Sequence, residues 1–285
     1  MSEITNTIGV VAAAPFVPEI WSALYIDQYI NNSVASGLVD RRFESDMKKG
    51  DTLHLGSITK VVPLSHTVNT DFTYNTNNEG WTNVSITNDY YIFRKLEKIT
   101  KVQSIVDMLT AYTKMDAAAM TEKVDATVTA TFDALHGGTR KGTIGVDVTD
   151  DNLIDCVTAL TTNNVPMTDR AWIISPETWG SLMKIDKFVR LDYVNPSGKT
   201  TAIESAKLNY PIYGAPVYVS TNLEANAGNH NCALIQKEAI ILIVQSEPTV
   251  KVAYDPRAGC DTILTECIWG LGEEREYNGI CLQGK

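Results

Sequence analysis

The stretch Asp169-Arg170-Ala171-Trp172-Ile173-Ile174-Ser175-Pro176-Glu177 joins a strand directly to the start of a helix. The four apolar residues 171–174 are typical of a strand that is covered on both faces. Ser175 supplies a helix N-cap, Pro176 suits the first helical position, and Glu177 places an acid in the first turn. The stretch therefore predicts an α/β unit.

The sequence on either side of this stretch extends the unit. Upstream, Thr149 or Asp150 can cap a helix whose apolar face is Leu153, Cys156, Val157 and Leu160. Downstream, residues 212–220 predict a bent strand that ends in a loop rich in Asn, Ala and Gly, at 221–231. We expect this unit to occupy residues 148–230.

A second element, residues 102–135, contains neither Gly nor Pro and repeats apolar residues every three to five positions. This spacing predicts one helix, roughly 50 Å long at a rise of 1.5 Å per residue. Gly137-Gly138 would end it. A helix of this length needs other elements packed along it, and we assign it to a segment 102–147.

Residues 46–101 predict a long β-hairpin. A turn at Lys48–Asp51 precedes alternating apolar residues from Thr52, a polar stretch at 69–83 follows, and alternation returns from Val84 to Ile92. A lone hairpin of this kind is marginally stable in water, so we expect it to bind a neighbouring molecule. The candidate contact residues are Phe72, Tyr74 and Trp81 near its tip and Trp21 in the N-terminal segment, which combines an apolar arm with a helix from Pro18.

Composition excludes several classes of protein. The chain has 285 residues, 44% hydrophobic and 20% charged, with a mean hydropathy of −0.09, which is ordinary for a globular protein. Its net charge of −10 makes it a poor general binder of nucleic acid. Five dispersed cysteines without a CxxC pair predict free, buried thiols made in a reducing cytosol. No signal peptide and no membrane-spanning stretch are predicted.

The chain shows no pattern of residues that would carry catalysis. Its four histidines are scattered, and Gly270-Leu271-Gly272 lacks the third glycine of a dinucleotide-binding loop. The cluster Glu273-Glu274-Arg275-Glu276 is typical of a solvated strand end or of an ion-pairing edge. We therefore expect no catalytic, cofactor-binding or metal-binding residues, no cofactor and no enzymatic activity.

The order of these elements resembles that of the tailed-phage major capsid (coat) protein family. Three stretches carry the resemblance: residues 18–21 with 37–41, Lys49-Gly50-Asp51-Thr52-Leu53-His54-Leu55, and residues 164–177 with Tyr213-Gly214-Ala215-Pro216-Val217-Tyr218-Val219-Ser220. The resemblance implies an α+β protein with the Hong Kong phage (HK-ninety-seven-like) capsid fold. Its parts would be an N-terminal arm and helix (1–45), an E-loop β-hairpin (46–101), a peripheral domain with the spine helix (102–147), an axial domain (148–230) and a C-terminal β segment of the peripheral domain (231–285).

The resemblance also implies a function. The chain would self-assemble as hexamers and pentamers into the icosahedral shell that encloses the DNA genome of a tailed bacteriophage, without binding that DNA specifically. Its partners would be further copies of itself, a separate scaffolding protein and a portal during assembly, and, in shells that carry one, a decoration protein, with no membrane. We expect a scaffolding protein encoded separately because few residues precede the arm, and no covalent cross-link because the hairpin tip lacks a lysine. The chain would be assembled in the host cytoplasm and reside in the virion.

Two alternatives stay open from the sequence. One is an encapsulin-like nanocompartment shell protein, which has the same fold and binds cargo peptides inside the shell. The other is an unrelated α+β enzyme with an unrecognised site. Measured turnover would favour the enzyme, and electron microscopy of the assembled protein would separate it from the two shell proteins.

Overall fold

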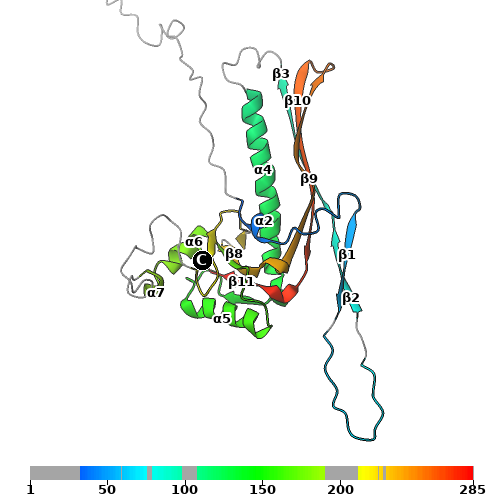
Figure 1. The fold of residues 1–285 in the computed structure, drawn as a ribbon. Helices are drawn as coiled ribbons and strands as arrows, with labels where there is room; N and C mark the ends of the chain where they lie inside the picture. The colour runs from blue at the N-terminus through cyan, green and yellow to red at the C-terminus, as the bar shows by residue number, and fades with distance from the viewer. Residues whose placement is uncertain are drawn as a thin grey trace, which may run out of the picture.

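The computed structural model describes residues 33–58, 60–75, 79–97, 108–189, 211–223, 225–226 and 229–284. A long helix stands beside a long, narrow sheet, a more compact α/β region lies at one end of both, and a hairpin projects from the side (Figure 1). The helices are α2 (Ala35–Leu38), α4 (Met108–Ala130), α5 (Asp150–Thr162), α6 (Pro176–Leu182) and α7 (Asp186–Val189). The strands are β1 (Thr52–Ile58), β2 (Glu79–Ser85), β3 (Asn88–Glu97), β4 (Arg140–Gly142), β5 (Arg170–Ile174), β6 (Val217–Val219), β7 (Ala225–Asn226), β8 (Asn229–Gln236), β9 (Ile240–Asp255), β10 (Cys260–Glu273) and β11 (Gly279–Gln283).

The compact region is built on a six-stranded sheet. Its order is β4-β11-β8-β5-β6, and β7 pairs with β8. Strands β5 and β11 are buried along their whole length, and Trp172 in β5 donates its indole N–H to the Ile212 carbonyl, 3.2 Å away. The main hydrophobic core of the described chain is centred on this sheet.

The helices predicted around the decisive stretch are confirmed. Helix α5 buries Leu153, Cys156 and Leu160. The Ser175 hydroxyl oxygen accepts a hydrogen bond from the Thr178 N–H at 3.0 Å and so caps α6. The bent strand predicted at 212–220 is shorter than expected, because Tyr213 and Gly214 adopt positive φ angles of 50° and 82° and only β6 stays extended.

Helix α4 forms the spine of the molecule. It packs on β9 and β10 of a three-stranded sheet with the order β3-β10-β9. The Arg94 side chain of β3 donates to Asp116 of α4 at 2.8 Å, and this carboxylate is fully buried. The helix ends at Ala130 rather than at residue 135, because 3₁₀ turns follow at Thr131–Asp133 and Leu135–Gly138; the start predicted at residue 102 lies outside the described residues.

The strand pairing corrects one expectation. Alternation from Val84 to Ile92 predicted one returning strand, but it is divided between β2, which pairs with β1, and β3, which pairs with β10. Within residues 231–285, β8 pairs with β5 and β11 pairs with β8 in the six-stranded sheet, whereas β9 and β10 belong to the three-stranded sheet. The alternation of a strand identifies its faces but not its partner. The domain boundaries themselves stay predictions.

Candidate inter-subunit interface

The hairpin β1–β2 carries three of the four residues predicted to contact a neighbouring molecule. Its strands are antiparallel, with Thr52 opposite Ser85 and Ile58 opposite Glu79. Beyond Ile58 the chain continues as a long loop that extends away from the rest of the molecule and returns at Glu79 (Figure 1). We call residues 58–81 the projecting loop. Trp21 lies outside the described residues.

The base of the hairpin is fixed to the body of the protein. Val84 is fully buried in a small cluster with Met47, Ile241 and Ile243, separate from the main core. Leu53, Leu55 and Ile86 pack against this cluster. The base therefore has its own apolar contacts, which hold the direction of the hairpin.

Two glycines of β10 allow the base of the hairpin to lie close against that strand. A Cβ atom on Gly272 would lie 2.5 Å from Val84 Cγ2, and one on Gly270 would lie 2.8 Å from the Ser85 carbonyl oxygen. Both distances are too short for real atoms, so a side chain at either position would displace the hairpin. The Gly-Leu-Gly sequence thus serves packing at this crossing.

The projecting loop exposes an unusual number of large apolar side chains. The predicted residues Phe72, Tyr74 and Trp81 are 81%, 99% and 75% exposed. Sequence reasoning took the outer part of the hairpin as mainly polar and missed further exposed apolar residues of the loop, which are Ile58, Val61, Val62, Leu64 and Val68. Their spacing in the sequence was the available signal. A concentration of exposed apolar side chains on one segment marks an interaction surface.

The end of the loop has some internal order. The Thr70 N–H and hydroxyl both donate to the Thr67 carbonyl, at 3.3 and 2.6 Å, and Asn69 between them has a φ of 64°. Asn tolerates this left-handed conformation better than most residues. Next to the turn, the rings of His66 and Phe72 stack with their centroids 4.4 Å apart.

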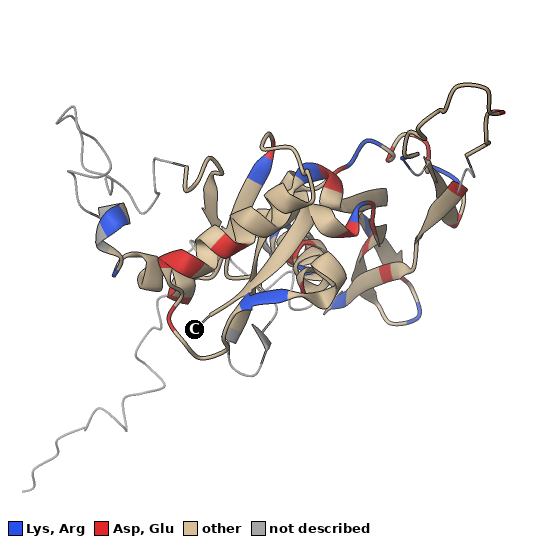
Figure 2. Cartoon of the chain, turned by 90° about the horizontal axis from the view of Figure 1, so that it is seen from below, with Lys and Arg blue, Asp and Glu red and all other residues tan. Residues whose placement is uncertain are grey.

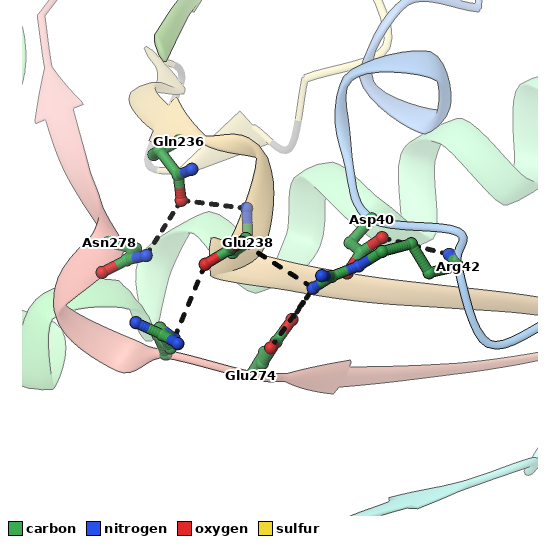
Figure 3. A network of polar contacts seen from close by, with 7 residues as sticks. Asp40, Arg42, Gln236, Glu238, Glu274 and Asn278 are labelled. Carbon is green, nitrogen blue, oxygen red and sulfur yellow. Dashed lines mark hydrogen bonds and ion pairs between the residues drawn. The ribbon is translucent and has the colours of Figure 1, made fainter. Parts of the chain in front are cut away.

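A polar network lies where the N-terminal part of the described chain meets the ends of β9 and β10 (Figure 3). Arg42 Nε donates to Asp40 Oδ2 at 2.6 Å, and an Arg42 NH2 nitrogen lies 3.4 Å from Glu274 and 3.9 Å from Glu238. Arg275 pairs with Glu238 at 3.7 Å. The ion-pairing edge predicted for the Glu273–Glu276 cluster is therefore present at Glu274 and Arg275.

Burial and the charge of Arg42 act in opposite directions on the pKa values of Asp40 and Glu274, the two carboxyls closest to Arg42. Burial raises the pKa of Asp40, but hydrogen bonds from the side chain and backbone of Arg42 outweigh it and hold the pKa below its ordinary value. Burial and the neighbouring carboxyls of Asp40 and Glu238 keep the pKa of Glu274 raised despite Arg42. The network therefore favours Asp40 as the anion that neutralises Arg42.

The described residues offer little for chemistry. None of them form a group of three or more His, Cys, Asp or Glu side chains that could hold a metal ion. An open pocket of about 660 Å³ beside the hairpin base is lined by Thr82, Thr131, Tyr277 and residues 271–274 and 276, which bring three glutamates together but no described basic group. No helix among the described residues is long and apolar enough to cross a membrane.

Charged residues of both signs are spread over the described part of the chain. Acidic and basic segments alternate along the described ribbon, and no continuous basic strip is visible from this side (Figure 2). With 34 acidic against 24 basic residues, the chain as a whole repels polyanions.

Comparison with known proteins identifies the fold. No protein-family model and no curated protein sequence matches the chain. Among solved structures it is similar to one from Mycobacterium phage Che8, with 21% identity, a TM-score of 0.81, and coverage of 95% of this chain and 98% of that one. It is also similar to the capsid structure of the cyanophage P-SCSP1u, with 15% identity, a TM-score of 0.77, and coverage of 99% and 96%. The capsid of a native GTA particle matches at 11% identity with a TM-score of 0.71, over 98% of this chain and 99% of that one. The chain therefore has the α+β Hong Kong phage (HK-ninety-seven-like) capsid fold.

Proposed function

We propose that this chain is the major capsid protein of a tailed bacteriophage and that it self-assembles as hexamers and pentamers into an icosahedral shell around DNA. The projecting loop is the observation that carries the proposal. It exposes eight large apolar side chains on a segment fixed at its base and uncovered over its length within the described chain. Such a segment is stabilised by burial against another molecule.

The fold and the charge support this function. Full-length similarity to capsid structures makes a structural role the simplest one for a chain of this shape. An acidic chain suits a container that must not hold its DNA tightly. Further copies of the chain are the first partner. A separate scaffolding protein, a portal, a decoration protein and assembly in the host cytoplasm are proposals that rest on the resemblance alone.

Shortening the projecting loop tests the proposal. Ile58 and Glu79 face each other in the hairpin register, so an Asn-Gly turn can replace residues 59–78 and close a short hairpin. The shortened chain should keep the far-ultraviolet circular dichroism and melting temperature of the parent, because residues 60–75 are exposed. Electron microscopy and light scattering should show shells for the parent and none for the shortened chain.

A matched control separates apolar contact from loop length. Replacing Val62, Val68 and Phe72 together by serine keeps the loop length and should abolish shells as the deletion does. Normal shells from the shortened chain would contradict the proposal. Shells that enclose a cargo protein instead of DNA when produced in the native host would favour the encapsulin-like alternative.

A further inference from the structure

A small pocket lies between α2, α4 and β9, next to the polar network: Arg41 lines it beside Arg42, and the Leu242 N–H, also at the pocket, donates to the Asp40 carbonyl at 2.9 Å. Its volume is about 160 Å³. Its apolar lining is provided by Val124 of α4, by Leu242, Val244 and Pro248 of β9, and by Cys267 of β10. Ser36, Arg41, Thr121 and Glu247 complete the lining. We call it the α4–β9 pocket.

A bulge in the long sheet forms the wall of this pocket. The register between β9 and β10 shifts on both sides of Ile268, opposite Ser246. The Cys267 thiol donates to the Ser246 carbonyl at 3.2 Å, and Pro248 follows, where it has no N–H to offer the ladder. A bulge bends its strand and redirects side chains. The bulge beside Ser246 therefore determines where the β9 side chains that line this pocket point.

The pocket has the size and lining for one aromatic ring. An apolar cavity of roughly 150 Å³ in another protein binds benzene. Leu242 and Cys267 are buried, whereas Arg41, Thr121 and Glu247 are exposed. A ring could therefore enter from solvent and displace water from apolar walls, while a polar group on the ring stays near the exposed side chains.

Among the exposed aromatic residues Phe72, Tyr74 and Trp81 of the projecting loop, we assign Tyr74 to the pocket, because Trp81 is held in the β1–β2 ladder opposite Gly56. Tyr74 is 99% exposed, whereas Phe72 already stacks on His66. Its hydroxyl can donate to the carboxylate of Glu247, for which the described part of the chain provides no ion-pair partner. The loop extends away from α4 in its own molecule (Figure 1), so the ring must come from another one.

We propose that the α4–β9 pocket receives the Tyr74 ring of a second copy of this chain, with the tyrosine hydroxyl donating a hydrogen bond to Glu247. The inference rests on the proposed function, since it names the partner surface of the projecting loop. In this contact, one copy of the chain provides the projecting loop and the other provides the α4–β9 pocket.

A photo-crosslinking amino acid at position 74 tests the contact directly. A benzophenone side chain is aromatic and can replace the tyrosine ring in assembled shells. After irradiation, mass spectrometry should find position 74 joined to peptides from residues 117–126 or 242–248 of another copy. Shells whose crosslinks go elsewhere, including to residues 1–32, would overturn this inference alone. A full-length chain that never assembles would overturn the proposed function with it.

Filling the pocket gives an independent test. The variant Thr121→Trp places a ring at the pocket from its own chain, and Thr158→Trp, at an exposed threonine of α5, is the matched control. We expect the yield of shells to fall about tenfold for Thr121→Trp and for Tyr74→Ala, as at an interface hot spot. Tyr74→Phe keeps the ring and loses one hydrogen bond, so a fall of roughly threefold is expected.

Circular dichroism of the unassembled chains must show the same fold for each variant, which is expected because Tyr74 and Thr121 are exposed. Equal shell yields for Thr121→Trp and Thr158→Trp would overturn the proposal. So would an undiminished yield for Tyr74→Ala.

Discussion

The six-stranded sheet and the β1–β2 hairpin are both β structure, but they bury their side chains very differently. Every residue of β5 is buried, whereas β1 and β2 together bury only Val84. The sheet carries its own core and needs no partner, while the hairpin is fixed at one end and exposes apolar side chains beyond it. The difference indicates that the stability of the single chain resides in the sheet; if the projecting loop is the proposed interface, the capacity to assemble resides in a separate region, and mutations can address each alone.

The largest expected effect compares two tryptophans. Trp172→Ala removes a fully buried ring from the six-stranded sheet and should cost about 3–5 kcal/mol of unfolding free energy. Trp81→Ala removes an exposed ring from the hairpin and should change that free energy by less than about 0.5 kcal/mol. Urea unfolding of the unassembled chains measures both. Similar losses in the two variants would break the distinction between the regions.

A second prediction tests how tightly the base of the hairpin is packed against the body of the protein. Gly272→Ala places a Cβ 2.5 Å from Val84 Cγ2 and should destabilise the chain by about 1–3 kcal/mol through overpacking. The control Gly180→Ala lies in α6 with no atom near the new methyl group, and should stabilise by up to about 1 kcal/mol. Thermal unfolding followed by circular dichroism measures the pair. A neutral Gly272→Ala would show that the hairpin base shifts freely.

The third prediction concerns Asp40, whose partner Arg42 is half exposed. Arg42→Met leaves the buried carboxylate without its guanidinium and should cost about 1–3 kcal/mol at neutral pH. Because the folded pKa of Asp40 lies below the ordinary value, its contribution is present above that value and is lost as pH falls through the folded pKa.

The pH dependence is measured as a difference. The gap in unfolding free energy between the parent and Asp40→Asn should close below about pH 4. Glu274 is present in both proteins, so its own contribution to the pH dependence of stability largely cancels in the difference. Its raised pKa would otherwise act against the effect of the lowered pKa of Asp40. A gap that stays constant down to pH 2 or widens would exclude Asp40 as the stabilising anion.

The smallest effect is expected beside α5. Tyr213 donates a hydrogen bond to Asp150, and Lys187 donates to both residues, to Tyr213 at 2.7 Å. Burial and the Asp150 hydrogen bond raise the pKa of Tyr213, so any stability this phenol adds is lost as pH rises through its folded pKa. Tyr213→Phe should destabilise by about 1 kcal/mol at pH 7 and flatten the decline at alkaline pH. An unchanged alkaline decline would mean that another group causes it.

The sequence predicted elements that local chemistry determines. The N-cap Ser175, Pro176 and the face of α5 are local signals, and the structure has them as expected. Strand β11 escaped prediction, because five residues near the chain end show no alternation when both faces are buried. Its partners β4 and β8 lie far away in the sequence.

The same reasoning applies to the proposed interface. Phe72, Tyr74 and Trp81 could be selected because aromatic residues near a polar turn are conspicuous. The α4–β9 pocket could not be predicted, because Ser36, Val124 and Pro248 meet only through tertiary packing around a bulge. Local pattern identifies a side chain that lacks a partner, and only the fold shows the surface that could receive it.

All five cysteines of the chain are buried, and burial raises the pKa of Cys156 to about 12. Burial keeps reagents away from all five sulfurs, so these cysteines should react slowly with maleimides and with mild oxidants in the folded protein. A cysteine introduced at an exposed position such as Thr158 would then be the one site at which a dye, a peptide or a second protein couples. If the chain forms the proposed shell, each particle would carry that attachment point once per subunit, in a regular array.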